Sequence, residues 1–236
     1  MGKERIDKII AAQGRHSRSQ VRELCRKGLV TVNGRVVKDP GEKADQEQDE
    51  IVAAGEPVAG ATIYLMMNKP AGVVSASRDP REKTVVDLVP EGLRRRGLFP
   101  AGRLDKDTVG FVLITNDGQF AHRILSPKRH VPKTYEALVA GGPDEETVRA
   151  FAAGMALEDG TFCRPAELTL LRPGDPALVR VVLREGMYHQ IKRMFLCLGC
   201  EVVWLKRTHI GGLALDDTLA PGECREILTK EKEKIL

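Results

Sequence analysis

Two carboxylates in a glycine-flanked loop are the side chains of this 236-residue chain best placed for chemistry. Asp105 and Asp107 stand within Gly102-Arg-Leu-Asp-Lys-Asp-Thr-Val-Gly110, just before the apolar run at residues 111–114. Loops at the ends of strands often carry catalytic groups. Two carboxylates can act as general acid and base, as in a glycosidase, but either one can also stabilise a turn through its own backbone. The residues alone leave these alternatives open.

The same loop is similar to the opening of a calcium site, but its later positions do not suit calcium. Val109 occupies a position that needs an oxygen ligand, and Asn116 stands where the bidentate glutamate should be. Cys197 and Cys200 have CxxC spacing without the second ligand pair that zinc requires. We therefore expect no metal site, and we expect both thiols to be small buried groups at a helix end.

The sequence of residues 61–236 predicts a domain of mixed secondary structure, and its helices and strands must position this loop. A helix is expected from Asp144, its N-cap, to Ala153, and Gly154 should end it. Strands and helices do not alternate strictly, which argues against a doubly wound parallel sheet. We expect an α+β fold with a mixed, mostly antiparallel sheet and flanking helices. The predicted strands are the β-like runs at residues 64–67, 111–114, 135–139 and 179–183.

Residues 1–58 predict a small separate domain with a segregated charge. Residues 1–38 contain ten Lys or Arg and three acidic residues, whereas residues 39–57 contain one Lys and seven acidic residues. The net charges of the two segments are therefore +7 and −6. Although the formal net charge of the whole chain is only +4, this separation predicts a basic face for a polyanion.

Two short helices and a hairpin are expected in this small domain. A helix over residues 5–13 should end at Gly14. A second helix should begin at the capping box Ser17-Arg-Ser-Gln20 and end at Gly28. Asn33-Gly34 between β-branched runs predicts the hairpin.

The second helix carries the arginines best placed to meet a polyanion. Arg18, Arg22 and Arg26 recur every fourth residue, so they line one exposed helix face. Planar guanidinium groups match the geometry of phosphate oxygens. Since aromatic residues are few, we expect contact to the backbone and shape of structured RNA rather than stacking on bases.

The small domain resembles the S4 RNA-binding domain in the stretch RIDKIIAAQGRHSRSQVRELCRKGLVTVNGRVV. That family has an Arg-x-Asp-Lys start, a Ser-Arg-Ser helix entry and a Gly-x-Val-x-Val-Asn-Gly hairpin, and all three are present. The resemblance implies an RNA-binding module and names no reaction.

The rest of the chain resembles the pseudouridine synthases that modify ribosomal RNA. An S4 domain ahead of a compact catalytic domain is similar to their RsuA branch, which modifies small-subunit RNA. Five motifs in the family's order make this resemblance far more specific than one motif would. They are NKPAG at 68–72, GRLDKDTVG at 102–110, TNDG at 115–118, KTY at 133–135 and EGMYHQIKRM at 185–194.

This resemblance implies that Asp105, the aspartate of GRLD, is the catalytic residue rather than a turn residue. It places Tyr135 against the base, for stacking and as the candidate general base. It makes Lys192 the group that holds the Asp105 carboxylate by a charge-assisted hydrogen bond. Pseudouridine formation breaks the C1′–N1 bond, turns the base and joins C1′ to C5. This isomerisation involves neither redox change nor group donor, so we expect no cofactor.

The target uridine must leave the folded RNA to reach the pocket. The family suggests that Arg103, beside the catalytic aspartate, fills the vacated space. His189 is expected to have a structural or RNA-contacting role, since nothing in the sequence pairs it with a nucleophile. The remaining predicted RNA contacts are basic residues of both domains: Arg15, Arg18, Arg22, Arg26, Lys128, Arg129 and Arg193.

The resemblance predicts 16S ribosomal RNA as the substrate, at a site of the uridine-516 class. The segments HRILSPKRHVPKTY and HIGGLALDDTLAPGECR are similar to this branch, and the C-terminus lacks a long basic tail. One alternative is a related synthase acting on 23S ribosomal RNA. Another is a non-catalytic S4-type RNA-binding protein, which the intact GRLD and KTY motifs disfavour.

The chain as a whole predicts a cytoplasmic protein without membrane contact. No apolar run approaches the roughly 18 residues of a membrane span. The start, MGKERIDKII, lacks a secretory apolar stretch. We also expect a monomer.

Overall fold

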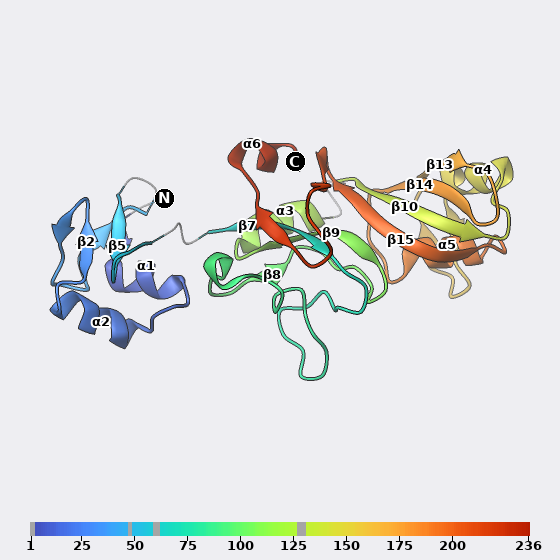
Figure 1. Ribbon diagram of the computed structural model, residues 1–236. Helices are drawn as coiled ribbons and strands as arrows, with labels where there is room; N and C mark the ends of the chain where they lie inside the picture. Colours follow the sequence, from blue (N-terminus) through green and yellow to red (C-terminus); the bar gives the residue numbers. More distant parts are fainter. Residues whose placement is uncertain (1–2, 47–48, 59–61, 127–130) are drawn as a thin grey trace. The chain divides into compact units, whose positions relative to one another are not determined.

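The computed structural model describes residues 3–46, 49–58, 62–126 and 131–236. The chain divides into two compact units by its internal contacts (Figure 1). The first comprises Met1–Ile63 and Pro90–Leu98, and the second comprises Tyr64–Val89 and Phe99–Leu236. The chain therefore leaves the first unit, returns to it once, and then completes the second.

The first unit begins with two helices, α1 (Ile6–Ala12) and α2 (Arg18–Arg26). The Ser17 hydroxyl accepts the backbone N–H of Gln20 at 3.3 Å, and Gln20 Oε1 accepts the backbone N–H of Ser17 at 2.7 Å. This reciprocal pair confirms the capping box predicted at the start of α2. Apolar side chains of both helices, Ile6 and Val21 among them, form the core of the unit with its strands.

Short antiparallel strands complete the first unit. Asn33 and Gly34 have φ angles of 51° and 77°, the left-handed conformation that a tight hairpin turn requires at both central positions. The predicted hairpin is therefore confirmed. One sheet has the order β3-β2-β5-β6, and β1 pairs with β4. The strands are β1 (Glu4–Arg5), β2 (Val30–Val32), β3 (Arg35–Val36), β4 (Lys43–Ala44), β5 (Ile51–Ala53) and β6 (Glu56–Pro57).

Residues 90–98 pack with the first unit although they follow the first strand of the second. They contain the 3-10 helix η1 (Glu91–Leu93). The backbone N–H of Arg96 donates to the carbonyl of Ala12 at 3.0 Å. Ala12 ends α1, where backbone carbonyls lack a partner within the helix. This return of the chain gives that carbonyl a partner, and no sequence pattern predicted it.

The second unit is built on one large sheet (Figure 1). Over the described ranges its strand order is β13-β14-β10-β15-β9-β7-β17, with β16 beside β15 and β8 beside β9. Neighbouring strands run antiparallel except β9 and β15, which run parallel. The predicted α+β class with a mixed, mostly antiparallel sheet is confirmed. The strands are β7 (Tyr64–Lys69), β8 (Phe99–Pro100), β9 (Val109–Thr115), β10 (Lys133–Ala140), β13 (Glu167–Arg172), β14 (Ala177–Leu183), β15 (Glu201–Ile210), β16 (Leu213–Ala214) and β17 (Cys224–Glu226).

Helices and a small hairpin flank this sheet. The Asp144 carboxylate accepts the backbone N–H groups of Glu146 at 2.9 Å and Thr147 at 3.0 Å, and Gly154 ends the helix with a φ of 76°. The predicted cap and stop are therefore confirmed. In the described part of the chain, no helix has the length and apolar character needed to cross a membrane. The flanking elements are α3 (Gly118–Leu125), α4 (Glu145–Ala153), α5 (Gln190–Leu196), α6 (Thr229–Glu233) and the hairpin β11 (Met155–Ala156) and β12 (Phe162–Cys163).

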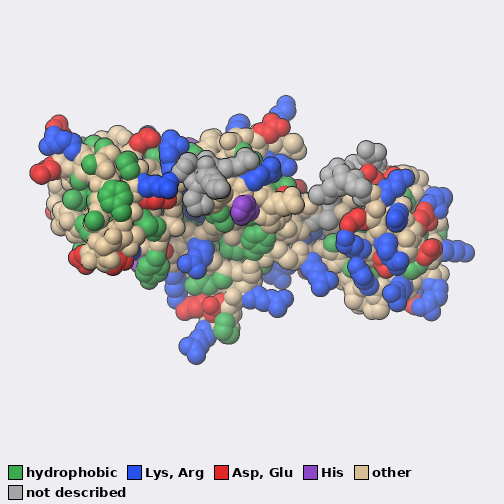
Figure 2. Space-filling model, turned by 180° about the vertical axis from the view of Figure 1, so that it is seen from behind, with side chains coloured by type: hydrophobic (Ala, Val, Ile, Leu, Met, Phe, Trp, Pro, Cys, Tyr) green, Lys and Arg blue, Asp and Glu red, His purple; other side chains and the backbone are tan. Residues whose placement is uncertain are grey.

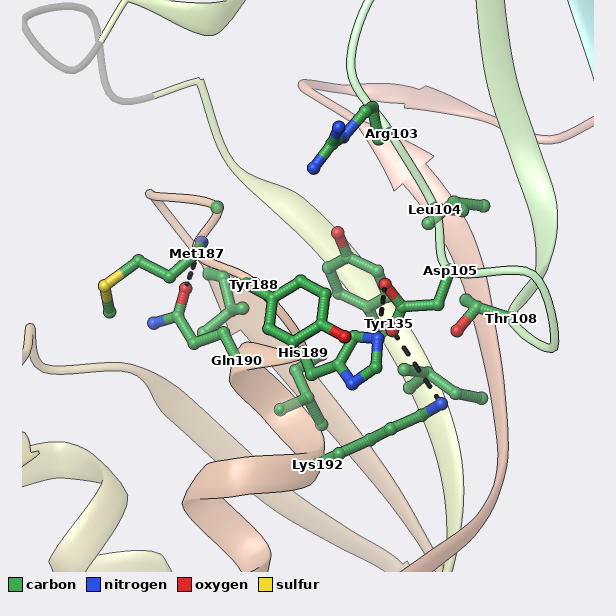
Figure 3. A pocket seen from close by; sticks show the side chains of 14 residues that line it. Arg103, Leu104, Asp105, Thr108, Tyr135, Met187, Tyr188, His189, Gln190 and Lys192 are labelled. Carbon is green, nitrogen blue, oxygen red and sulfur yellow. Dashed lines mark hydrogen bonds and ion pairs between the residues drawn. The ribbon is translucent and has the colours of Figure 1, made fainter. Parts of the chain in front are cut away.

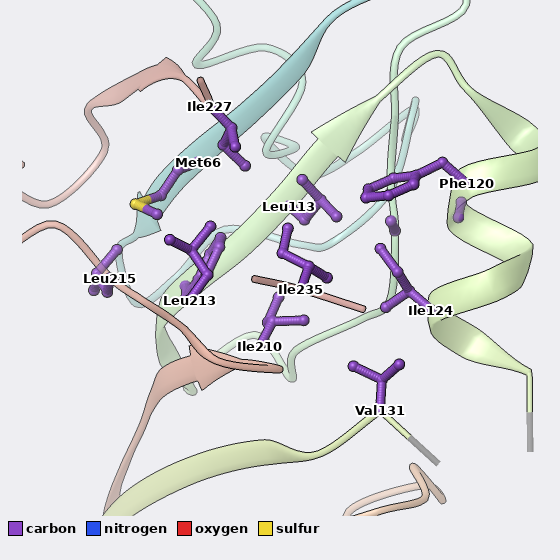
Figure 4. Close-up of a cluster of buried hydrophobic side chains, with 13 residues drawn as sticks. Met66, Leu113, Phe120, Ile124, Val131, Ile210, Leu213, Leu215, Ile227 and Ile235 are labelled. Carbon is purple, nitrogen blue, oxygen red and sulfur yellow. The ribbon is translucent and has the colours of Figure 1, made fainter. Parts of the chain in front are cut away.

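An apolar cluster fixes β9, the strand that follows the carboxylate loop (Figure 4). Phe111 and Leu113 of β9 are fully buried, as is Phe120 of α3. Ile235 joins the same cluster from beyond α6. Burying one such side chain contributes about 1.5–3 kcal/mol, so the cluster anchors the strand firmly.

Gly110 lies where the parallel strands β9 and β15 approach most closely. It pairs with Arg207 in the register of the two strands and has a φ of +98°. A Cβ atom at this position would lie 2.4 Å from the Arg207 carbonyl oxygen and 2.8 Å from Lys206 Cγ. Only glycine fits both the left-handed backbone and the close approach. The last residue of the carboxylate loop is thus dictated by the strand junction behind it.

We expect Gly110→Ala to lower the free energy of unfolding by roughly 3 kcal/mol or more, because it adds a backbone clash to an unfavourable φ. Gly160→Ala is the matched control, since Gly160 has a φ of +79° and no atom within 4 Å of its Cβ position. That variant should lose only about 1 kcal/mol. Urea denaturation of both variants measures the difference, and equal losses would contradict the assigned clash.

Candidate active site

The loop between β8 and β9 carries Asp105 into a pocket of the second unit (Figure 3). The pocket draws its walls from this loop, from β10, β14 and β15, and from the segment that leads into α5. Segments far apart in the sequence therefore meet at one carboxylate. The lining residues are Arg103, Leu104, Asp105, Thr108, Tyr135, Leu183, Leu205 and the run 186–192.

Lys69, at the end of β7, anchors the loop that carries Asp105 through its buried side chain. Its side chain is fully buried, and its Nζ donates to the backbone carbonyls of Thr108 at 2.7 Å, Pro70 at 3.0 Å and Lys106 at 3.1 Å. Burial lowers the pKa of Lys69 to about 8, although the nearby carboxylates Asp107 and Asp105 act in the opposite direction. The ammonium group thus satisfies buried carbonyls on both sides of Asp107. Sequence reasoning missed this role, although the lysine stands in the NKPAG motif.

Ser75 holds the residue that precedes the catalytic candidate. Its buried hydroxyl accepts the backbone N–H of Leu104 at 3.0 Å and donates to the Leu104 carbonyl at 2.9 Å. A buried hydroxyl that fills both roles fixes the backbone on either side of one residue. Ser75 and Lys69 together clamp the loop immediately before and after Asp105, and no motif of the sequence indicated Ser75.

The Asp105 carboxylate lies between two basic side chains (Figure 3). Its Oδ1 is 3.5 Å from His189 Nε2, and its Oδ2 is 3.7 Å from Lys192 Nζ. The carboxylate side chain keeps 26% of its surface exposed. Both contacts are at ion-pair distance but longer than an ordinary hydrogen bond. The carboxylate oxygens are therefore stabilised by charge while staying open towards the pocket.

Lys192 gives its hydrogen bonds to Asp107 rather than to Asp105. Its Nζ is 2.7 Å from both oxygens of Asp107, whose side chain is 72% exposed. The hydrogen bond from Lys192 lowers the pKa of Asp107 more than partial burial raises it. The expectation that Lys192 hydrogen-bonds Asp105 is wrong for this structure. The Lys192 ammonium group extends from α5 between the two carboxylates and lies nearer to that of Asp107.

His189 is placed against Asp105, contrary to the expectation that nothing pairs it with a nucleophile. It adopts a left-handed backbone, with φ 48° and ψ 33°, at the residue before α5. Its ring stacks on Tyr188 with centroids 3.8 Å apart and planes 16° apart. A left-handed non-glycine residue is costly and persists where its surroundings demand it. Here the strained backbone turns an imidazole towards the carboxylate of a loop 84 positions earlier in the sequence.

Tyr135 forms the apolar wall of the pocket. It lies on β10, is 9% exposed, and pairs with Val181 of β14 and Arg207 of β15. The Arg207 guanidinium carbon is 6.0 Å from the centroid of its ring, within the range of a cation–π contact. Tyr135 and Asp105 line the same pocket, which therefore combines an aromatic surface with a carboxylate.

The residues predicted to contact RNA are distributed over both units. Arg103 is exposed at the pocket and points away from Asp105 in Figure 3, whereas Arg193 on α5 is paired with Asp159 at 2.5 Å. Lys128 and Arg129 lie outside the described residues. The predicted contacts of the first unit are all exposed: Arg15, which is 3.9 Å from Glu56, Arg18, Arg22, and Arg26, which is 2.5 Å from Glu23.

The two cysteines of the CxxC sequence lie at the end of α5. Cys200 is buried, as predicted, whereas the prediction of a buried thiol is wrong for Cys197, which is exposed. The reason is that residue 197 caps the helix on its solvent side. Among the residues that the structure describes, no group of His, Cys, Asp or Glu side chains is arranged to hold a metal ion.

Two family models match the chain. The model described as RNA pseudouridylate synthase matches residues 63–196, which include the whole pocket except Leu205. The S4 domain model matches residues 4–51. The two matches follow one another along the chain and together account for most of both units.

Similar proteins align with nearly the whole chain. An uncharacterised RNA pseudouridine synthase of Bacillus subtilis is 45% identical over 96% of each chain. The ribosomal small subunit pseudouridine synthase A of Escherichia coli K12 is 40% identical over 96% of this chain and 97% of its own. A crystal structure of a pseudouridylate synthase superimposes with a TM-score of 0.68 at 38% identity, covering 99% of this chain and 100% of the other.

We expect Lys69→Met to lower the free energy of unfolding by on the order of 3 kcal/mol, because it leaves buried carbonyls without a donor. Lys106→Met is the control from the same loop, since Lys106 is half exposed and pairs with Glu82 at 2.9 Å. Its loss should stay below about 1 kcal/mol. Chemical denaturation compares the two variants. A loss for Lys69→Met as small as that of the control would show that its ammonium group does not anchor the loop.

Proposed function

This chain belongs to the RNA pseudouridylate synthase family, and from that membership we propose that it isomerises one uridine of 16S ribosomal RNA. The protein is a pseudouridine synthase with an S4 domain, and its reaction converts uridine to pseudouridine in RNA. Similarity along 96% of the chain to the small-subunit synthase of Escherichia coli is the observation that carries the 16S substrate. The site that we propose is of the uridine-516 class.

Asp105 is the catalytic carboxylate of this proposal. The reaction breaks the C1′–N1 bond and forms a C1′–C5 bond, while C5 loses a proton and N1 gains one. A carboxylate can add to the sugar or base, or remove a proton from the sugar, and so divide the reaction into easier steps. Its oxygens must be ionised but not occupied by tight hydrogen bonds. Contacts of 3.5 Å and 3.7 Å to His189 and Lys192 leave the oxygens open, with the positive charge of Lys192 nearby.

Lys192 acts on Asp105 through its charge, and Asp107 holds Lys192 in position. The three side chains form a row in which the outer carboxylate accepts both short contacts from the ammonium group. The Asp105 carboxylate therefore lies near a fixed positive charge without accepting a short hydrogen bond from it. His189 adds a second polar group on the opposite oxygen. This division of roles makes Lys192 and His189 positioning residues for Asp105.

Tyr135 stacks on the uracil ring while the base turns. An aromatic face supports a flat base in more than one orientation, which suits a base that must rotate between bond cleavage and bond formation. The tyrosine hydroxyl is the candidate base for the C5 proton. Tyr135→Phe keeps the ring and removes only the hydroxyl. Release of tritium from C5-tritiated RNA at the wild-type rate by this variant would exclude the hydroxyl as that base.

The S4 domain supplies phosphate contacts through the exposed arginines of α2. Lys and Arg side chains are spread over the face of the first unit in Figure 2. Arg18 and Arg22 have no carboxylate at ion-pair distance among the described residues, whereas Arg26 is paired with Glu23. Arg18 and Arg22 should therefore contribute more than Arg26. Each lost contact should flatten the dependence of log affinity on log salt by roughly 0.7–0.9, which titration of the Arg18→Gln and Arg22→Gln variants tests.

The proposed partner is ribosomal RNA alone or in an assembling small subunit. This substrate implies a cytoplasmic location, where ribosomes are assembled. One chain contributes the whole pocket, so we propose a monomer. Light scattering of the purified protein, with and without RNA, tests that state.

Asp105→Asn should lower turnover by at least about a thousandfold, because the amide cannot act as a nucleophile or base. RNA affinity and the melting temperature should stay close to wild type. Asp107→Asn is the matched control from the same loop. The amide keeps an oxygen that can still accept from Lys192, so turnover should fall by no more than about tenfold. Tritium release measures both, and clear residual turnover by Asp105→Asn would refute its assignment.

Deletion of the gene should remove one pseudouridine from 16S ribosomal RNA and none from 23S ribosomal RNA. Expression of the wild-type chain in the deletion strain should restore it, and expression of Asp105→Asn should not. Chemical mapping of pseudouridine over both RNAs measures the outcome. Loss of a pseudouridine from 23S instead would establish the alternative substrate while leaving the synthase activity intact.

A further inference from the structure

A second cavity of the catalytic unit lies beside the pocket, and five of its eleven lining residues are basic. It shares Arg103 and Tyr135 with the pocket that contains Asp105, so the two spaces adjoin. Its walls come from β10, β15 and the segment between β12 and α5. The charged lining residues are Arg103, Lys133, Arg164, Arg184, Glu185 and Arg207.

Glu185, the acidic residue of this lining, already has hydrogen-bond and ion-pair partners other than the inner cations. Glu185 Oε1 accepts the backbone N–H of Arg164 at 3.0 Å and the side-chain amide of Gln190 at 2.5 Å. Its second oxygen is 3.9 Å from Arg164 Nε. Arg184 is 3.7 Å from Glu167, at the exposed rim. Neither carboxylate reaches the two inner cations of the cavity.

Those inner cations are Arg207 and Lys133. Arg207 is 3% exposed, and its Nε donates to the Phe111 carbonyl at 2.7 Å. Its Nη2 is buried without a hydrogen-bond partner in the described part of the chain. Lys133 is partly buried, and no carboxylate of the described residues lies at ion-pair distance from it. Burial, and to a lesser extent the charge of Arg207, lower the pKa of Lys133 to about 8.

Two adjacent cations without a counter-ion are costly in a partly desolvated site. The structural role of Arg207, its bond to Phe111, uses only one of its donors. The cost is recovered when an anion enters, because guanidinium and ammonium groups then gain charge-assisted hydrogen bonds. The substrate of this enzyme carries one such anion at every nucleotide, the backbone phosphate.

We propose that this cavity binds a backbone phosphate flanking the target uridine, with Lys133 and Arg207 as its inner ligands and Arg184 at its rim. The base then lies against Tyr135, which borders both spaces, while the sugar faces Asp105. The phosphate contact positions C1′ relative to the carboxylate and makes a nucleotide within a chain a better substrate than a nucleoside. This inference rests on the proposed function, in which Asp105 is the catalytic residue of the adjoining pocket.

The test pairs a neutral RNA linkage with loss of one cation. Substrate RNA is prepared with a methylphosphonate in place of the phosphate on the 5′ or the 3′ side of the target uridine. With wild-type enzyme, one of these replacements should lower kcat/KM by on the order of tenfold. With Lys133→Met the same replacement should have little further effect, because its partner is already gone. Lys133→Arg should keep the sensitivity, and Lys230→Met, on exposed α6, should behave as wild type.

Two results would overturn the phosphate site. One is that the neutral linkage lowers kcat/KM by the same factor in Lys133→Met as in the wild type. The other is that the wild type acts on both neutral linkages at the rate of unmodified RNA. Lys133→Met should melt at or above the wild-type temperature, since it removes a charge without a partner. If it does not fold, Arg184→Gln takes its place in the same comparison, because the Arg184 side chain is 54% exposed. Turnover of unmodified RNA by the wild type is a separate readout. Its absence with both a 16S fragment and an assembling small subunit would refute the 16S substrate only, and the comparison then uses the RNA that mapping identifies.

Discussion

The loop that carries Asp105 depends on one buried ammonium group. Lys69 has no contact with solvent, and it is solvated instead by the carbonyls of Pro70, Lys106 and Thr108. The Thr108 carbonyl would otherwise be buried without this donor, so the charge and the loop stabilise one another. The neutral hydroxyl of Ser75 likewise forms hydrogen bonds with the backbone of Leu104. Asp105 stands between these anchors, and a carboxylate held through its backbone keeps its side-chain oxygens open towards the pocket.

The parallel junction of β9 and β15 brings the rest of the site to that loop. It joins two antiparallel halves of the sheet, so that β10 and α5 lie beside a loop that belongs to β9. Gly110 permits the approach, and Arg207 fastens it through the Phe111 carbonyl. The same arginine reaches the ring of Tyr135. The residue that closes the sheet therefore also shapes the wall against which a base would lie.

Charge is distributed unevenly across the two adjoining spaces. One is lined by Asp105, with Lys192 and His189 close to it, and the other is lined by Lys133 and Arg207, which have no carboxylate of the described residues at ion-pair distance. A nucleotide has a matching asymmetry, because its phosphate is anionic and its C1′ becomes electron-poor as the glycosidic bond breaks. The arrangement favours one orientation of the nucleotide, with the sugar towards the carboxylate.

The sequence by itself determined what depends on neighbouring residues. The Ser17 capping box, the Asn33-Gly34 turn and the Asp144 cap are local hydrogen-bonding patterns, and all three were predicted. The order of five motifs identified the family by resemblance, and that resemblance made Asp105 the candidate for catalysis. Tertiary structure alone decided which groups meet: Lys192 bonds Asp107 across 85 positions, His189 faces Asp105, Lys69 becomes buried, and residues 90–98 return to the first unit. Periodicity and capping rules describe one turn or one strand, and they contain no information about side chains that only the folded sheet brings within 4 Å of each other.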